Sequence, residues 1–407
     1  FGAVTSTSPG TSRRVSRWNE WRPPAARIRG AWGEILKIVH IVGARPNFMK
    51  IAPIMRAFDR TGETDQVLVH TGQHYDEELS RYFFEDLGLP RPDVDLGVGS
   101  GPHGLQTGRV MIALEPVLMR ERPDWVFTVG DVNSTVAAAL VAAKLGIRVA
   151  HVEAGLRSGD WTMPEEINRV VTDRLSDALF TTEPSAAENL AREGVPADRV
   201  HFVGNVMIDT LLQHRERAAR LNVAQNMGLV PGSFLLATLH RPSNVDDPDR
   251  LSGLLLALAE IVAGTAHPVL LPVHPRTSAR IRELRLESLL DPLTILPPLR
   301  YLDFLGLMQD AAGVITDSGG IQEETTVLGI PCVTVRPNTE RPVTLTHGTN
   351  RLFDGDPHLL LDVVREALMD RRPAESPPLW DGHAADRIAA ITLQSDEVRV
   401  ESVPNGS

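Results

Sequence analysis

Short apolar runs alternate with longer helix-like stretches from Leu36 onward, and this alternation is the pattern of a parallel sheet flanked by helices. The first half contains candidate strands at residues 36–42, 66–71, 125–130, 148–152, 178–182 and 199–203. A second series starts at Phe234, with candidate strands at residues 234–238, 268–273, 293–296, 313–316 and 331–335. We therefore predict an α/β protein with two Rossmann-like, doubly wound domains that face each other across a cleft.

The polar stretch between the two series, residues 213–232, predicts a surface helix and the connection to the second domain. A Pro-rich segment at residues 374–378 precedes a last helix candidate at about residues 383–393. We expect four parts in chain order: an N-terminal extension, an N-terminal Rossmann-like domain, a C-terminal Rossmann-like domain and a C-terminal helix. Their expected bounds are 1–33, 34–208, 209–380 and 381–400.

The first 33 residues have six arginines, several Ser, Thr and Pro, and no periodic apolar pattern. This composition predicts a mobile, disordered extension. The Arg/Ser bias is typical of an organelle transit peptide, whereas Trp18, Trp21 and Trp32 are unusual in one. A segment unrelated to targeting therefore remains an equal alternative.

Composition and charge exclude several classes of function. The 407 residues carry a net charge of −11, so no basic surface argues for nucleic-acid binding. No apolar run approaches the ~20 residues of a membrane span. The single cysteine, Cys332, excludes an internal disulfide framework and is expected to be a core residue, which fits a reducing cytoplasm.

The ends of the predicted strands carry the candidate chemistry, because ligands of such sheets bind beyond the carboxyl ends of the strands. After strand 313–316, Asp317-Ser318-Gly319-Gly320 leads into a helix that includes Glu324. Helix N-termini with free N–H groups bind anions, and glycines let a ligand approach the backbone, although an ordinary Ser-capped turn has the same sequence. Arg45 and Lys50 flank the turn after strand 36–42 and are suited to a diphosphate.

Two carboxylates follow neighbouring strands of the first half. Asp131 follows strand 125–130 and Glu153 follows strand 148–152, so we expect both at one edge of the sheet. Adjacent carboxylates have pKa values pushed apart, which equips one as an acid and one as a base. The alternative for Asp131 is a helix N-cap, and His151 is the expected partner of Glu153.

Further candidates lie on the loops and helices that follow other strands. Pro164-Glu165-Glu166 opens a helix, where Arg169 is positioned to pair with Glu165 four residues earlier, although acids at a helix start are common. His240 and His274 end two successive strands of the second half, and Arg341 lies in the loop after the last one. These residues predict contact with an anion.

Two patterns do not carry function. Gly99-Ser100-Gly101-Pro102-His103-Gly104 matches a dinucleotide fingerprint but contains a proline and follows no clean strand. The thirteen histidines are scattered, without a Cys pair or an H-E-x-x-H motif, so we expect no metal and no cofactor.

Taken in order, these motifs resemble those of the non-hydrolysing UDP-N-acetylglucosamine 2-epimerases, from about Leu36 to Leu393. The resemblance rests on Gly-Ala-Arg-Pro with Lys50, Thr71-Gly72-Gln73-His74, Gly130-Asp131, residues 151–157 (HVEAGLR), Pro164-Glu165-Glu166 with Asn168-Arg169, Gly204-Asn205, His240-Arg241, residues 317–324 (DSGGIQEE) and Thr339-Glu340-Arg341-Pro342. It implies a twin-Rossmann, glycosyltransferase-B type fold, a homodimer and a last helix that crosses back to the first domain.

The resemblance also implies roles for individual residues. Those expected to hold the diphosphate are Arg45, Lys50, His240, Ser318, Gly319, Gly320 and Arg341. Glu324 is expected at the ribose, and residues 301–304, including Phe304, near uracil. Those expected around the sugar are Asp131, Glu153, Glu165 and Arg169. We place Asp131, Glu153, Glu165 and His240 in the catalytic set and His274 among the substrate-binding residues.

The implied reaction inverts C2 of UDP-N-acetylglucosamine to give UDP-N-acetylmannosamine. C2 is not next to a carbonyl, so simple deprotonation is very difficult. Eliminating UDP from C1 while a base removes the C2 proton gives 2-acetamidoglucal, and re-addition with a proton from the other face inverts C2. This chemistry needs phosphate-binding residues for the leaving group and carboxylates around the ring, and no cofactor.

Four alternatives remain open from the sequence. The loop at Gly159-Asp160-Trp161 is shorter than in some members and points to a related UDP-2-acetamido sugar, such as a diacetamido-uronic acid. A hydrolysing epimerase would release free N-acetylmannosamine. A glycosyltransferase of the same fold would need an acceptor. A non-catalytic binder of sugar nucleotides would not need the carboxylates.

Overall fold

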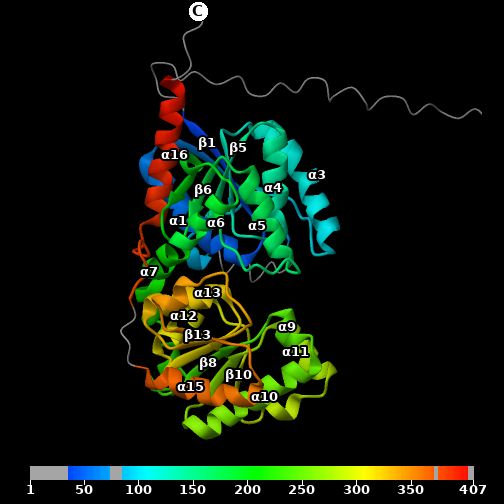
Figure 1. Cartoon of the computed structure of the whole chain (residues 1–407), viewed down its shortest axis with the longest axis vertical. Coiled ribbons are helices and arrows are strands. Elements are labelled where there is room, and N and C mark those ends of the chain that lie inside the picture. The colour runs from blue at the N-terminus through cyan, green and yellow to red at the C-terminus, as the bar shows by residue number, and fades with distance from the viewer. Residues whose placement is uncertain (1–34, 74–84, 371–374, 402–407) are drawn as a thin grey trace, which may run out of the picture.

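The computed structural model of the chain describes residues 35–73, 85–370 and 375–401, and it has two parallel sheets with helices on their faces (Figure 1). The expected extension at 1–33 and the motif residue His74 lie outside the described residues. The first sheet and its helices form the upper half of Figure 1, and the second sheet with its helices forms the lower half. The predicted α/β fold class is confirmed.

Over the described residues, the first sheet has seven strands in the order β3-β2-β1-β4-β5-β6-β7, and all its pairings are parallel. Its strands are β1 (Leu36–Val42), β2 (Thr64–His70), β3 (Val94–Asp95), β4 (Trp125–Val129), β5 (Arg148–Ala154), β6 (Ala178–Thr181) and β7 (Val200–Phe202). Its helices are α1 (Arg45–Thr61), α3 (His103–Glu121), α4 (Asn133–Lys144), α5 (Pro164–Leu175) and α6 (Pro184–Arg192), with a 3₁₀ turn η2 (Ala197–Arg199). Central strands are buried on both faces, which explains their nearly continuous apolar sequences.

The second sheet has six strands within the described residues, in the order β10-β9-β8-β11-β12-β13, again all parallel. Its strands are β8 (Leu235–Thr238), β9 (Val269–Pro272), β10 (Thr294–Leu296), β11 (Gly313–Thr316), β12 (Cys332–Val335) and β13 (Asn350–Phe353). Its helices are α8 (Val223–Asn226), α9 (Pro242–Val245), α10 (Pro248–Thr265), α11 (Pro275–Glu283), α12 (Tyr301–Asp310), α13 (Gly319–Leu328), α14 (Val343–Thr346) and α15 (Leu360–Met369), with 3₁₀ turns η3 (Glu287–Leu290) and η4 (Pro357–Leu359).

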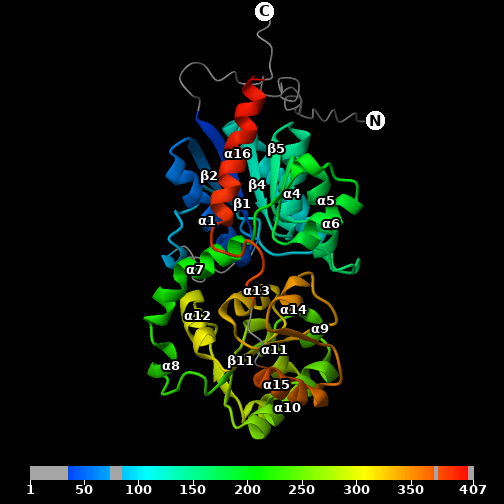
Figure 2. The same cartoon turned by 60° about the vertical axis from the view of Figure 1, so that its left-hand side comes forward.

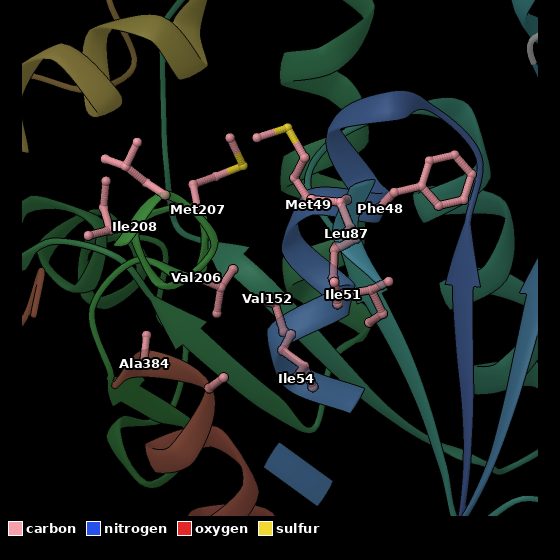
Figure 3. Packing of buried hydrophobic residues seen from close by; sticks show 14 of the residues in the cluster. Phe48, Met49, Ile51, Ile54, Leu87, Val152, Val206, Met207, Ile208 and Ala384 are labelled. Carbon is pink, nitrogen blue, oxygen red and sulfur yellow. The ribbon is translucent and has the colours of Figure 1, made fainter. Parts of the chain in front are cut away.

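Helix α7 (Val206–Ala219) connects the two halves and packs against α1 of the first and α12 of the second (Figures 1 and 2). Its Val206, Met207 and Ile208 are buried in one apolar cluster with Met49 and Ile51 of α1 (Figure 3). This cluster also includes buried residues of the second sheet. The two halves therefore share part of their hydrophobic core through α7.

Helix α16 (Ala384–Glu401) brings the chain back from the second sheet to α1, beside which it lies (Figure 2). The carboxylate of Asp209 on α7 accepts hydrogen bonds from the backbone N–H groups of Ala384 at 3.2 Å and Ala385 at 2.7 Å, which fixes the start of α16. The sequence predicted a helix here that ends near residue 393, and the observed helix continues to Glu401.

The two segments that cross between the halves contact each other. Gly204 has φ +88°, and a Cβ at this position would collide with the carbonyl oxygen of Leu379. Trp380, next in the second crossing, is buried and donates from Nε1 to the carbonyl oxygen of Thr182 at 2.8 Å. The relative position of the halves is thus set by packing at both crossings. Across the described ranges, we find no helix with the length and apolar character needed to cross a membrane.

Candidate functional site

The candidate site lies where the carboxyl ends of β1, β4 and β5 in the first sheet face the loops after β8, β11 and β12 in the second. Contacts between the two sides are made by charged side chains. Arg341, in the loop after β12, donates from Nη2 to Oε1 of Glu153 at 2.6 Å. Residues from both halves therefore meet at the place where the cleft was predicted.

Glu153 occupies a distorted position near the end of β5. The pairing of β5 with β6 shifts register between Val152 and Ala154, and Glu153 has φ +73°. A non-glycine residue in this region is strained and persists only where its surroundings hold it, as is common at functional sites. Lys50 donates to Oε2 of Glu153 while Arg341 donates to Oε1, so both oxygens are engaged.

The expected pairing of His151 with Glu153 is wrong. Nδ1 of His151 lies 2.6 Å from Oδ1 of Asp173, and its Nε2 is 2.9 Å from the carbonyl oxygen of Gly130. The alternation of side chains along a regular strand predicted the Glu153 contact. The register shift and the positive φ at Glu153 break that alternation, so the two side chains have different partners.

Asp131 contacts Arg169 rather than capping the following helix. The N-cap of α4 is Val132, and Nη2 of Arg169 donates to Oδ2 of Asp131 at 2.6 Å. Burial raises the pKa of Asp131, but the positive charges of Arg169, Lys50 and Arg341 outweigh it and hold the pKa below its ordinary value. The N-cap alternative is therefore wrong. The Asp131 side chain is 27% exposed to solvent.

Glu165 and Glu166, at the start of α5, differ sharply. Glu166 is buried and accepts hydrogen bonds from Arg169 at 2.8 Å and from the backbone N–H groups of Ser158 at 3.0 Å and Gly159 at 2.9 Å. Glu165 is half-buried and has no hydrogen bond or ion pair with the residues that the structure describes. The expected pair of Glu165 with Arg169 is wrong, because Arg169 pairs with Glu166, three residues earlier, and with Asp131 at the end of β4.

The start of α13 has the features predicted for an anion site. Ser318 is the N-cap without a capping hydrogen bond from its side chain, and Gly319 and Gly320 form the first turn. A Cβ at Gly319 would lie 2.8 Å from Nη1 of Arg341, so glycine permits the close approach of this guanidinium. The arrangement places a cation and the helix N-terminus side by side.

Asp317 connects this turn to the end of β8. Its buried Oδ2 accepts from the backbone N–H groups of His240 and Arg241, both at 2.9 Å. Nδ1 of His240 lies 2.6 Å from Oδ1 of Asp317, and 45% of the His240 side chain is exposed. Asp317, which precedes Ser318, therefore orients the His240 ring, whose Nε2 has no hydrogen-bond partner among the described residues.

Glu324 pairs with Tyr301 at the start of α12. The Tyr301 hydroxyl donates to Oε1 of Glu324 at 2.9 Å. Burial raises the pKa of Glu324 to about 7, although the Tyr301 hydrogen bond opposes the shift. Phe304 is half-buried on the same helix and packs against the shared apolar cluster.

The described contacts of the site do not include two predicted residues, Arg45 and His274. Arg45 is the first residue of α1, but its side chain lies outside the described part of the chain. His274 is the exposed N-cap of α11, with Nδ1 3.3 Å from the backbone nitrogen of Arg276. It follows β9, which is separated from β11 by β8, so the sheet order places it farther from α13 than His240.

Several charged residues of the site were not among the predicted set. Glu340 contacts Arg341 at 2.9 Å and Arg336 at 2.7 Å, and Glu323 accepts from Nε of Arg341 at 2.6 Å. Both glutamates lie inside motifs that the sequence singled out, next to residues that were assigned a role. Glu323 is contacted by Arg341 from another loop, and Glu340 also lies near Arg169 and Arg241 of distant segments, so no local pattern indicates these contacts.

Comparisons with known proteins agree on one family. A family model described as UDP-N-acetylglucosamine 2-epimerase matches residues 56–393. A UDP-N-acetylglucosamine 2-epimerase of Methanocaldococcus jannaschii is 41% identical over 362 residues, 88% of this chain and 98% of that protein. A UDP-2,3-diacetamido-2,3-dideoxy-D-glucuronate 2-epimerase of Pseudomonas aeruginosa is 41% identical over 357 residues, 87% of this chain and 98% of that protein.

Solved structures give the same result. The M. jannaschii UDP-GlcNAc 2-epimerase in complex with UDP-GlcNAc and UDP superposes with a TM-score of 0.83 and 42% identity, over 88% of this chain and 100% of that one. The Neisseria meningitidis UDP-GlcNAc 2-epimerase bound to UDP-GlcNAc gives a TM-score of 0.81 with 27% identity, also over 88% and 100%. The predicted glycosyltransferase-B type fold is confirmed by these matches.

Proposed function

The chain belongs to the UDP-N-acetylglucosamine 2-epimerase family, and from this premise we propose that it interconverts UDP-N-acetylglucosamine and UDP-N-acetylmannosamine. One observation carries the proposal. Cations hold Asp131 and Glu153 at adjacent strand ends of the first sheet. Opposite them, in the second half, Arg341 lies beside the N-terminus of α13. The first side is suited to proton transfer at a sugar ring and the second to a diphosphate.

The reaction we propose begins by breaking the bond between C1 and the diphosphate oxygen while the C2 proton passes to a carboxylate. The electron pair of the C2–H bond forms the double bond of 2-acetamidoglucal. UDP then adds back to C1, and a proton is delivered to the opposite face of C2. Two acid/base groups on different sides of the ring are required, and the candidates are Asp131, Glu153 and Glu165.

The UDP leaving group is stabilised by positive charge and by N–H groups. We assign this role to Lys50, His240 and Arg341 with Ser318, Gly319 and Gly320, and we add Arg45 by resemblance. Glu324 is assigned to the ribose hydroxyls, and Phe304 to the region of the uracil. Arg169 orients Asp131, which it contacts at 2.6 Å.

The engagement of both Glu153 oxygens has a chemical consequence. Glu153 has Lys50 on one oxygen and Arg341 on the other, so neither oxygen is free of a cation. A diphosphate attracts both cations, because charge-assisted hydrogen bonds to phosphate oxygens are strong. In this mechanism Lys50 or Arg341 donates to the diphosphate in place of Glu153, and the freed oxygen of Glu153 can then accept the C2 proton.

A diacetamido-uronic acid derivative is the second candidate substrate, because the P. aeruginosa relative is as identical to this chain as the M. jannaschii one. Such a sugar carries a C6 carboxylate. On the sugar side, Asp131 and Glu153 are paired with cations, whereas Glu165 has no ion pair with the described residues, and a second anion beside Glu165 meets repulsion. The charge pattern therefore favours the neutral N-acetylglucosamine.

We further propose a homodimer and a cytoplasmic location. A reducing compartment fits the lone Cys332, which is buried and unpaired. The division into a sugar-binding part at 34–208, a nucleotide-binding part at 209–380 and a helix at 381–400 is retained as a proposal, supported by the two sheets and the return of α16 to α1.

Incubation with one sugar nucleotide and no acceptor tests the function. The expected products from UDP-N-acetylglucosamine are a mixture of the two UDP-sugars, separated by chromatography, with the same mixture reached from UDP-N-acetylmannosamine. Free N-acetylmannosamine with UDP as main products would assign a hydrolysing enzyme. No turnover of UDP-N-acetylglucosamine, with turnover of the diacetamido-uronic acid derivative, would assign the second candidate.

A further inference from the structure

Six charged side chains form a continuous line of alternating sign across the site, which we call the charge chain. In order, its members are Asp131, Arg169, Glu340, Arg341, Glu153 and Lys50. The first three links measure 2.6 Å, 3.6 Å and 2.9 Å. Arg341 then lies 2.6 Å from Glu153, which also accepts from Lys50.

Glu340 is the central link between two groups with proposed roles. On one side, Arg169 holds Asp131 at the end of β4. On the other side, Arg341 holds Glu153 at the end of β5. The first half of the molecule supplies Asp131, Arg169, Glu153 and Lys50, whereas Glu340 and Arg341 come from the loop after β12 in the second half.

The surroundings of Glu340 are strongly cationic. Beside Arg169 and Arg341, it accepts a hydrogen bond from Arg336 at 2.7 Å, and Nη2 of Arg241 lies 3.7 Å away. Glu340 is 3% exposed. Burial raises its pKa, but the four guanidinium groups outweigh burial and hold the pKa well below its ordinary range. Glu340 is therefore an anion that separates mutually repelling arginines.

We propose that Glu340 is a positioning residue for the epimerase reaction, which sets the places of Arg169 and Arg341 and, through them, of Asp131 and Glu153. This inference rests on the proposed function. Glu340 acts through the arginines and has no contact with substrate in this account. Its negative charge, and not its volume alone, is required.

Loss of the charge has two consequences of opposite sign. Without the negative charge, Arg169 and Arg341 repel each other and move apart. Because Asp131 and Glu153 are salt-bridged to these arginines, both carboxylates are displaced from the positions needed for proton transfer. At the same time the site becomes more positive by one charge, which favours a diphosphate. If Glu340 served only to stabilise the fold, Glu340→Gln would lower both kcat and the affinity for UDP.

The test is a comparison of wild type with Glu340→Gln and Glu340→Asp in the full-length chain. Glu340→Gln should lower kcat by about 10- to 100-fold, the range for misplaced reacting groups. It should also tighten UDP binding by about 2- to 5-fold at low salt, a gain that added salt removes. Glu340→Asp keeps the charge and should recover most of kcat and the wild-type UDP affinity.

Asp173→Asn is the matched control, since Asp173 is buried to a similar degree and contacts Arg157 and His151 outside the charge chain. This variant should lower the thermal midpoint without tightening UDP binding. Weaker UDP binding in Glu340→Gln, or an unchanged kcat, would overturn the proposal.

A failure of the proposed function is distinguishable from a failure of this inference. Wild type that binds UDP but does not epimerise UDP-N-acetylglucosamine would refute the function. The sign of the change in UDP affinity in Glu340→Gln would still decide the role of the charge.

Discussion

Nη2 of Arg341 lies 2.6 Å from Oε1 of Glu153 and joins the loop after β12 in the second sheet to the end of β5 in the first. Arg341 also donates from Nε to Glu323 on α13 at 2.6 Å. One guanidinium thus connects a residue assigned to proton transfer with the helix whose N-terminus is assigned to the diphosphate. Changes on either side of the cleft are therefore expected to affect the other side.

Neutral replacements of the two strand-end carboxylates should separate chemistry from binding. Asp131→Asn and Glu153→Gln are each expected to lower kcat on the order of 10²-fold or more, the scale of a lost general acid or base. UDP affinity, measured by calorimetry, should not fall in either variant, and Glu153→Gln should raise it, because the neutral side chain competes less with the diphosphate for Lys50 and Arg341. A variant with near-normal kcat would remove that carboxylate from the catalytic set.

The two glutamates at the start of α5 offer a matched pair. Glu165→Gln should lower kcat on the order of 10²-fold with no loss of stability, because Glu165 has no side-chain partner among the described residues. Glu166→Gln weakens the hydrogen bonds that hold Ser158 and Gly159 and should lower the free energy of unfolding by about 1–3 kcal/mol. Denaturation in urea and steady-state kinetics on both variants check this. The assignment fails if Glu165→Gln is destabilised and Glu166→Gln is not.

Removal of the Arg341 side chain should weaken UDP binding. Arg341→Ala is expected to reduce the affinity by about 1.5–3 kcal/mol, the scale of a charged hydrogen bond. The control is Arg148→Ala at the opposite end of β5, where Arg148 stacks 4.3 Å from the ring centre of Trp125. Calorimetric titration should show a change only in the first variant, and equal affinities in both would contradict the assignment.

We expect Glu183 to make the stability of the protein depend on pH. It follows β6, is 1% exposed, and burial raises its pKa to about 7 from an ordinary value of 4.5. The unfolded chain therefore loses this proton at lower pH than the folded one, and stability falls as pH rises between about 4.5 and 7. Glu183→Gln removes this loss and should stabilise the protein at pH 8 by at most about 3 kcal/mol relative to its effect at pH 4.5.

Urea denaturation at the two pH values measures this difference. The exposed Glu188 on α6 provides the control, and Glu188→Gln should change stability at neither pH. An equal effect of Glu183→Gln at both pH values would show that burial does not govern this carboxyl group.

The sequence predicted most strands because buried parallel strands have continuous apolar sequences. β1 was predicted at its observed bounds, Leu36–Val42. The edge strands β3 (Val94–Asp95) and β13 (Asn350–Phe353) were missed, because one has two residues and the other contains Asn350 and Arg351. Such short or polar strands give little periodic signal, whereas the other two edge strands, β7 and β10, were predicted.

The site was predicted only as far as strand order determines it. The βαβ connection placed Asp131 and Glu153 at one edge, and the structure has both there. The partner of Glu153 was missed because a register shift near Val152 cannot be seen in an apolar strand. Glu340 was missed because its partners Arg169 and Arg241 lie far away in the sequence and meet it only after the two sheets pack.

The central claim is that C2 is inverted by elimination and re-addition of UDP, with proton transfer by the carboxylates of the first sheet. Proton NMR of UDP-N-acetylglucosamine incubated with the protein in D2O tests it most directly. The account predicts UDP-N-acetylmannosamine with deuterium at C2 and a slower appearance of deuterium at C2 in the remaining substrate. Epimerised product that keeps its original C2 proton would contradict the account.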